Sequence, residues 1–236
     1  MRLSGARTGG RDRAGRDCAR RAAAVSGLAA LILGLLSPSG ARAADWKLTA
    51  ATGAAHSFRT PLSIEQEGFP ELRVSARYDN RPFETPIHWV LRLSLGRSGA
   101  AWELQHLHHK LYLRNRPPEV ERFEVTHGFN VLTLGRAWTR GGFGLRAGAG
   151  VVIAHPESTV RGRRFGPRQG IFGLDQYLTG PALVLGASRE WRLGRRAFVS
   201  PELQLSAARA RVPIREGQAS APNVAIHFLI GLGWRF

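Results

Sequence analysis

The chain has 236 residues, 34 of them basic and 17 acidic, and therefore a formal net charge of +17. Hydrophobic residues make up 43% of it, yet beyond the amino-terminal region no apolar run approaches the roughly 18 residues of a membrane-spanning helix, which excludes a helical membrane protein. Such a positive charge would suit a nucleic-acid-binding protein. The export signal and the scattered arginines described below argue against that class.

Residues 1–43 have the features of an export signal. They contain eight arginines, an apolar run from Ala22 to Leu36 and the small-x-small sequence Ala41-Arg42-Ala43, which is typical of a cleavage site. The run is too short for a comfortable membrane span, so we expect cleavage after this site and one remaining domain, 44–236. A retained anchor is the alternative. The only cysteine, Cys18, would be removed with the signal, so no disulfide would stabilise the exported domain.

Removal of this segment leaves 26 basic and 15 acidic residues, a net charge of +11. The basic residues are 24 arginines and two lysines that form no cluster with aromatic residues. Because an exported protein does not meet the genome, we expect no nucleic-acid partner. The planar guanidinium group binds phosphate well, so the charge favours the phosphate-rich headgroup of lipopolysaccharide as a partner.

The last segment, 224–236, has a large apolar residue at nearly every second position. This period of two over a dozen residues indicates a strand with one apolar face. Soluble strands are usually about half as long, whereas a tilted strand needs about 9–11 residues to cross a bilayer. The terminal Phe236 resembles the ending of bacterial outer-membrane barrel proteins, and that resemblance implies recognition by the barrel assembly machinery. A long edge strand of a soluble β-sandwich is the alternative.

Eight alternating segments are predicted strands: 46–56, 86–97, 100–113, 123–138, 143–155, 175–192, 197–213 and 223–236. Tight links are expected at 97–100, 139–142 and 193–196, and long links at 57–85, 114–122, 156–174 and 214–222. Short periplasmic turns that alternate with larger external loops are typical of up-and-down membrane barrels. We therefore predict an all-β, eight-stranded, antiparallel up-and-down transmembrane β-barrel in the bacterial outer membrane, as a monomer.

An eight-stranded barrel has room inside only for side chains. The residues predicted to point inward include seven charged ones: Lys47, Arg92, Arg146, Arg235, Glu103, Glu190 and Glu202. Opposite charges there should pair, because an unpaired buried charge is costly, and the result would be a plugged core rather than a pore. We expect irregularities at Pro181, near 106–109 and near Val131, and an extension of the second strand above the membrane by 71–79.

Polar residues gather at the external ends of the predicted strands. The third and fourth strands are consecutive, so His108 or His109 should lie opposite Glu124 or His127 across the hairpin. Imidazoles and carboxylates at one rim suit a divalent metal or a general base. The alternative is a set of hydrogen-bonded side chains with a purely structural role.

Three segments resemble motifs of the outer-membrane lipid A oxidases. They are 78–92, which contains Tyr78-Asp79-Asn80-Arg81-Pro82-Phe83-Glu84-Thr85-Pro86, then His108-His109-Lys110-Leu111-Tyr112, and Phe123-Glu124-Val125-Thr126-His127-Gly128-Phe129-Asn130. The early His56-Ser57 also fits. The resemblance implies an eight-stranded barrel and oxygen-dependent oxidation of the proximal glucosamine of lipid A to an aminogluconate. His127 stands where the family pattern has an acid, and Val125 where it has an aromatic residue.

Hairpin geometry and this resemblance together predict one cluster at the external rim. Its members are Glu84, His108, Lys110, Glu124 and Asn130, with His56, His109 and His127 nearby. Glu84 or Glu124 would act as base or metal ligand, His108 as ligand or proton carrier, and His127 would complete the catalytic set. A divalent metal would be held by His56, His108 and His109. Lys110 and Arg81 would anchor a lipid phosphate.

Two other functions compete with oxidation. A lipid A deacylase would need a His-x-Ser pair on one strand face, whereas His56 and Ser57 are adjacent and should face opposite ways. A non-enzymatic barrel that binds lipopolysaccharide would use the arginines of the long third loop, which are Arg161, Arg163, Arg164 and Arg168.

Overall fold

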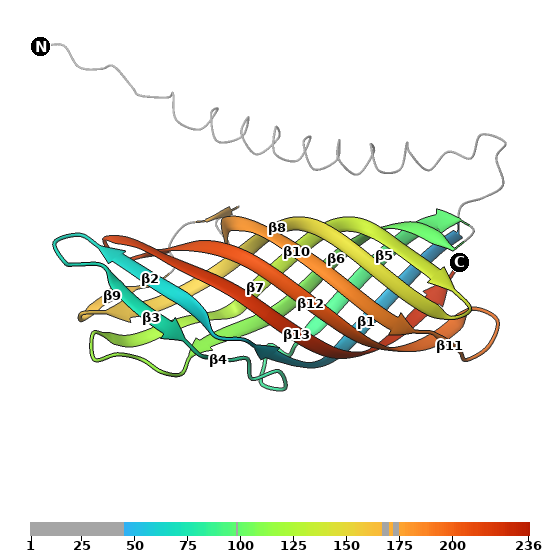
Figure 1. Cartoon of the computed structure of the whole chain (residues 1–236), viewed down its shortest axis with the longest axis horizontal. Coiled ribbons are helices and arrows are strands. Elements are labelled where there is room, and N and C mark those ends of the chain that lie inside the picture. The colour runs from blue at the N-terminus through green and yellow to red at the C-terminus, as the bar shows by residue number, and fades with distance from the viewer. Residues whose placement is uncertain (1–44, 98, 167–169, 172–174) are drawn as a thin grey trace, which may run out of the picture. The chain divides into compact units, whose positions relative to one another are not determined.

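The computed structural model describes residues 45–97, 99–166, 170–171 and 175–236, so the predicted signal, 1–43, lies outside the described residues. Eight long strands form a closed antiparallel ring (Figure 1): β1 (Asp45–Ser57), β5 (Trp89–Arg97), β6 (Ala100–Leu113), β7 (Val120–Arg140), β8 (Phe143–Val160), β10 (Tyr177–Arg189), β12 (Ala197–Ile214) and β13 (Gly217–Arg235). Each pairs with its neighbours in chain order, and β13 closes the ring by pairing with β1 from Lys47 opposite Arg235 to Ser57 opposite Ala225. The predicted eight-stranded up-and-down barrel is confirmed.

The links 97–100, 140–143 and 192–197 join consecutive barrel strands at one end, which we call the turn end, and Asp45 and Phe236 lie there too. We call the opposite end the loop end. In the part of the chain that the structure describes, no helix is long and apolar enough to span a membrane.

The long links of the prediction are wrong in detail, because much of their length is strand. Residues 214–222 are not a loop: β12 reaches Ile214, β13 begins at Gly217, and only Arg215 and Glu216 turn between them. Similarly, β7 begins at Val120 and β8 continues to Val160. These extensions keep their apolar alternation beyond the predicted membrane span, so their pairing buries a second set of side chains at the loop end.

Short strands complete this upper part. They are β2 (Thr60–Gln66), β3 (Leu72–Ala76), β4 (Tyr78–Asp79) and β9 (Arg163–Phe165), while β11 (Trp191–Arg192) lies near the turn end. The predicted extension of the second strand by 71–79 is right only for 78–79, where β4 pairs with β6 beyond the end of β5. The preceding strand, β3, pairs instead with β2, and β2 pairs with β13. Leu62 and Ile64 of β2 close an apolar core with residues such as Leu111, Phe123 and Val212.

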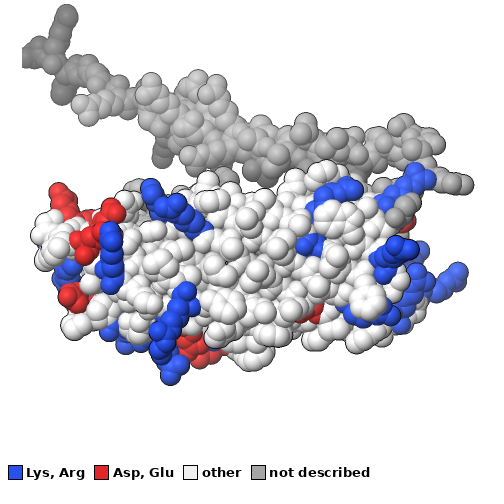
Figure 2. All heavy atoms as spheres, viewed as in Figure 1, with Lys and Arg blue, Asp and Glu red and all other residues white. Residues whose placement is uncertain are grey.

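The outer surface of the barrel carries an apolar belt. Exposed large apolar side chains on it include Leu91, Leu93, Trp102, Leu104, Leu132, Leu134, Leu183, Leu185, Phe228, Ile230 and Leu232. Figure 2 shows an uncharged band across the middle of the visible face, with lysines and arginines gathered toward both ends. A broad exposed apolar surface on a closed barrel is the lipid-facing surface of a transmembrane protein.

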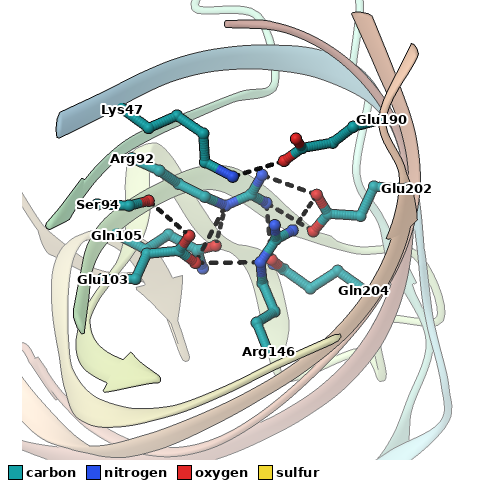
Figure 3. Close-up of polar contacts among 9 residues, drawn as sticks. All are labelled: Lys47, Arg92, Ser94, Glu103, Gln105, Arg146, Glu190, Glu202 and Gln204. Carbon is teal, nitrogen blue, oxygen red and sulfur yellow. Dashed lines mark hydrogen bonds and ion pairs between the residues drawn. The ribbon is translucent and has the colours of Figure 1, made fainter. Parts of the chain in front are cut away.

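The interior near the turn end is polar, and its charges pair as predicted (Figure 3). Arg92 binds Glu202 at 2.7 Å, and Arg146 lies 3.0 Å from Glu103 and also pairs with Glu202. Closer to the turn end, Glu190 accepts hydrogen bonds from Lys47, at 2.5 Å, and from Arg235. All seven charged side chains predicted to point inward therefore take part in ion pairs within the barrel.

The predicted irregularities also occur. The β8–β10 pairing shifts between Leu178 and Gly180, just before Pro181. The β6–β7 pairing shifts between His109 and Leu111, and the β7–β8 pairing shifts between Val125 and Phe129, which leaves 126–128 as a bulge. Since a bulge re-aims the side chains that it contains, these last two shifts shape the candidate site.

Candidate functional site

The polar end of β6 lies on the outer face of the barrel. The side chains of β6 that point into the barrel are those of Glu103, Gln105, Leu107, His109 and Leu111. The intervening residues share the face of the lipid-exposed Trp102 and Leu104, and they are His106, His108, Lys110 and Tyr112. The sequence therefore changes, along one outward stripe, from membrane-facing apolar residues to histidine, lysine and tyrosine.

This change falls at the edge of the apolar belt. Asn130, which lies opposite His108 on β7, is eight residues from Trp138 near the turn end. At about 3.3 Å per residue and a tilt of about 40°, that stretch rises roughly 20 Å, compared with an apolar band about 25 Å tall in such barrels. By this estimate the His108–Asn130 pair lies near the loop-end edge of the apolar belt.

Asn130 orients two imidazoles. Its Oδ1 is 2.8 Å from Nδ1 of His108 and 3.2 Å from Nε2 of His106, while its Nδ2 donates to Gln176 at 3.2 Å. Trp89 stacks on the His108 ring with the ring centroids 5.6 Å apart. An amide oxygen only accepts, so Nδ1 of His108 carries the proton and Nε2 carries the lone pair. This Nε2 atom has no hydrogen-bond partner among the described residues.

Two cations flank this pair at its loop-end side. Lys110 donates to the backbone carbonyl of Glu84 at 2.7 Å, and the guanidinium of Arg81 lies 4.2 Å from the ring centroid of Tyr112. The carboxylate of Glu84 is exposed and lies 3.5 Å from Arg81. Glu84 therefore contacts Lys110 through its backbone, and its carboxylate faces solvent.

A further group of polar side chains on the outer face links β7 to β8. Arg122 binds Glu124 at 2.9 Å and Glu157 at 2.7 Å, and the hydrogen bond that Arg122 donates to Glu124 is the main cause that raises the pKa of Arg122. His127 and His155 lie beside Glu157, with their ring centroids 4.9 Å apart. Burial lowers the pKa of His155 and His127 lowers it further, against the raising effect of Glu157.

The structure thus brings Glu84, His108, Lys110, Glu124, His127 and Asn130 to one outer face at the loop end. We call these residues, with Arg81, Tyr112, Arg122, His155 and Glu157, the outer patch. The sequence analysis missed Arg122, His155, Glu157 and Gln176. One signal was available, because His155-x-Glu157 has the spacing of two that puts both side chains on one strand face.

The predicted metal set of His56, His108 and His109 does not converge. His109 points into the barrel, against Phe129 and a buried pair in which Nε2 of His88 lies 3.0 Å from Nδ1 of His227. His56 is exposed on β1, two strands away from β6, and contacts Phe58. The prediction was wrong because neighbouring residues on a regular strand face opposite sides of the wall.

The arginines of the long third loop also differ from the prediction. Arg161 donates to the carbonyl of Pro70 at 3.0 Å, Arg163 pairs with Glu216, and both stack near Phe69. They hold the loop-end hairpins together. Arg164 is exposed within β9, and Arg168 lies outside the described residues.

A closed barrel with an apolar belt and a polar patch at the belt's edge is a transmembrane β-barrel with a candidate site on its outer wall. No protein-family model matches the chain, and no curated protein matches it. Among solved structures, the attachment invasion locus protein Ail of Yersinia pestis matches at 9% identity and a TM-score of 0.39, over 83% of this chain and 100% of Ail.

Two further solved structures match at similar distance. The outer membrane protein AlkL matches at 11% identity and a TM-score of 0.44, over 85% of this chain and 93% of AlkL. The Escherichia coli outer membrane protease OmpT matches at 8% identity and a TM-score of 0.43, over 84% of this chain and 99% of OmpT. No activity or partner is carried over from these proteins.

Proposed function

We propose that this chain is exported, loses residues 1–43 and is inserted by the barrel assembly machinery into the bacterial outer membrane, where its outer patch oxidises lipid A. The observation that carries this proposal is the position of His108 and Asn130, which form a buried polar pair on the outer wall near the loop-end edge of the apolar belt. Polar groups at the edge of a membrane need polar partners. A lipid headgroup is the partner that this location supplies.

The filled interior of the barrel supports an approach of the substrate from the membrane. Ion pairs fill the barrel near the turn end, and an apolar core fills it near the loop end. A substrate would therefore reach the outer patch laterally from the membrane. Arg81, whose side chain is exposed, lies beside the pair and would bind a phosphate of the headgroup, whereas Lys110 is buried and donates to the backbone of Glu84.

The resemblance to lipid A oxidases implies oxidation at the anomeric carbon of the proximal glucosamine. His108 Nε2 would take the proton of a free C1 hydroxyl as a general base. The C1–H bond would break as two electrons pass to dioxygen, which gives a lactone and hydrogen peroxide. Hydrolysis of the lactone then yields the aminogluconate, with a net gain of one oxygen atom.

Mass spectrometry of lipid A from cells with and without the gene tests this function. We expect one added oxygen atom in the proximal unit with the native protein and none with His108→Ala. His56→Ala is the matched control, because it removes an exposed imidazole at the same end but outside the outer patch. Both variants should retain the different gel migration of folded and boiled protein. Unmodified lipid A with the native protein would refute the proposal.

A non-enzymatic barrel that binds lipopolysaccharide is the second candidate, and Arg81 and Lys110 at the belt's edge favour it. In that case lipid A would bind without change in mass. A deacylase is less well supported, because Ser57 is buried and accepts hydrogen bonds from Asn80 and Asn223, at 3.1 and 3.0 Å, while His56 points the other way.

A further inference from the structure

We propose that His127, His155 and Glu157 bind one divalent first-row transition-metal ion on the outer wall, beside the His108–Asn130 pair. Two histidines and one carboxylate are a common ligand set for such ions. Three candidate ligand atoms, one from each residue, lie within 4.8 Å of one another. The binding site goes beyond the proposed function and does not depend on it.

The distances fit a shared ion better than direct contacts. Glu157 Oε1 lies 3.6 Å from Nδ1 of His127 and 3.8 Å from Nε2 of His155. These separations are too long for good hydrogen bonds, which rarely exceed about 3.2 Å. Ligands about 2.0–2.2 Å from a tetrahedral ion lie roughly 3.3–3.6 Å apart, so a small contraction would seat the ion.

The strands deliver these side chains to one place. His155 and Glu157 are two residues apart on β8 and share its outer face. His127 comes from the bulge 126–128 of β7, where Gly128 has a φ of 129°. A Cβ at Gly128 would overlap the side chain of Asn130, so glycine permits the bulge that carries His127 toward β8.

Neighbours hold the carboxylate of Glu157 through both oxygens, and Oε1 keeps a second lone pair for a ligand. Arg122 binds Oε2 of Glu157 at 2.7 Å, and Thr126 donates to Oε1 at 3.2 Å. Such supporting contacts orient metal-binding carboxylates. Since Arg122 also holds Glu124, the guanidinium is fixed between two strands. Oε1 therefore faces both imidazoles.

The ligand set also narrows the choice of ion. Two histidines and one carboxylate leave coordination positions open, an arrangement used for non-haem ferrous iron and for catalytic zinc. Ferrous iron is the ion that would supply oxygen chemistry next to His108, and this choice rests on the proposed function. The remaining positions would face solvent, because the His127 side chain is 64% exposed.

Metal binding can be measured on the mature barrel purified from membranes in detergent. We expect about one Fe(II) bound per barrel under anaerobic conditions, and a Co(II) absorption band when Co(II) is used as an oxygen-stable probe. Glu157→Gln and His155→Ala should each weaken binding at least tenfold, in the range seen when metal sites lose a supporting group. His56→Ala should bind as the native barrel does.

Two outcomes would overturn the metal site. One is native binding no tighter than that of Glu157→Gln, provided that both proteins keep heat-modifiable migration. The other is native-like metal binding by His155→Ala, which would place the ion elsewhere on the barrel. Undiminished lipid A oxidation by Glu157→Gln without bound metal would instead leave the site and the proposed function standing and refute a role of the metal in the oxidation. Conversely, stoichiometric binding that needs His155 and Glu157, with lipid A unchanged in mass, would support the site and refute the oxidation.

Discussion

Glu202 shows how a single residue stabilises the barrel interior. Its carboxylate is almost fully buried and pairs with two guanidinium groups, those of Arg92 and Arg146. Removing one partner of a buried ion pair leaves an uncompensated charge, which typically costs about 3–5 kcal/mol. We therefore expect Glu202→Gln to lower the free energy of unfolding by about that amount.

Urea unfolding in lipid vesicles, followed by tryptophan fluorescence, would measure this loss. The matched control is Glu71→Gln, because Glu71 pairs with the exposed Arg73 and exposed pairs contribute little. Equal midpoints for Glu202→Gln and the native protein would show that water or another side chain replaces the carboxylate.

Single residues also show how far the sequence could define the candidate site. The period of two identified the inward charges, such as Arg92 and Glu202, because every barrel strand alternates between its two faces. It did not assign His108 and His109 to opposite sides, since the predicted strands lost phase near them. His127 comes from a bulge whose position depends on pairing with β8, and a single strand's pattern does not contain that pairing.

At the scale of elements, β10 depends on one glycine. Gly180 has a φ of 154°, and a Cβ there would overlap the carbonyl oxygen of Arg209 on β12. We expect Gly180→Ala to destabilise the barrel by about 1–3 kcal/mol, because the close approach of the two strands would have to open.

The same unfolding measurement in vesicles would test Gly180→Ala. Gly166→Ala is the control, since nothing lies within 4 Å of a Cβ at that position. The expectation fails if the two substitutions shift the unfolding midpoint equally.

The elements at the loop end were the least predictable from sequence. Membrane-spanning lengths were predicted within a few residues, because apolar alternation and tight turns mark them on the chain. Residues 214–222 were predicted as a loop, but β12 reaches Ile214 and β13 begins at Gly217. Within this segment, Ile214, Ala219 and Ala221 pack into the apolar core with β2. Pairing with a distant segment outweighed local composition.

At the scale of the whole molecule, two different layers close the barrel. Near the turn end, Arg92, Arg146, Glu103 and Glu202 form a connected group of ion pairs (Figure 3). Toward the loop end, buried apolar residues such as Leu107, Phe129 and Val152 belong to the core that β2 covers. Each layer removes the water path that a pore requires.

We therefore expect the purified barrel to insert into planar lipid bilayers without producing conductance steps. The variant with Arg92→Ser and Glu202→Ser should remain silent as well, because it opens only the charged layer and leaves the apolar layer in place. Single-channel recording with a known general porin in the same bilayers would confirm that openings are detectable. Reproducible steps from the native barrel would show that the interior conducts, whereas steps from the double variant alone would show that the ion pairs are the only seal.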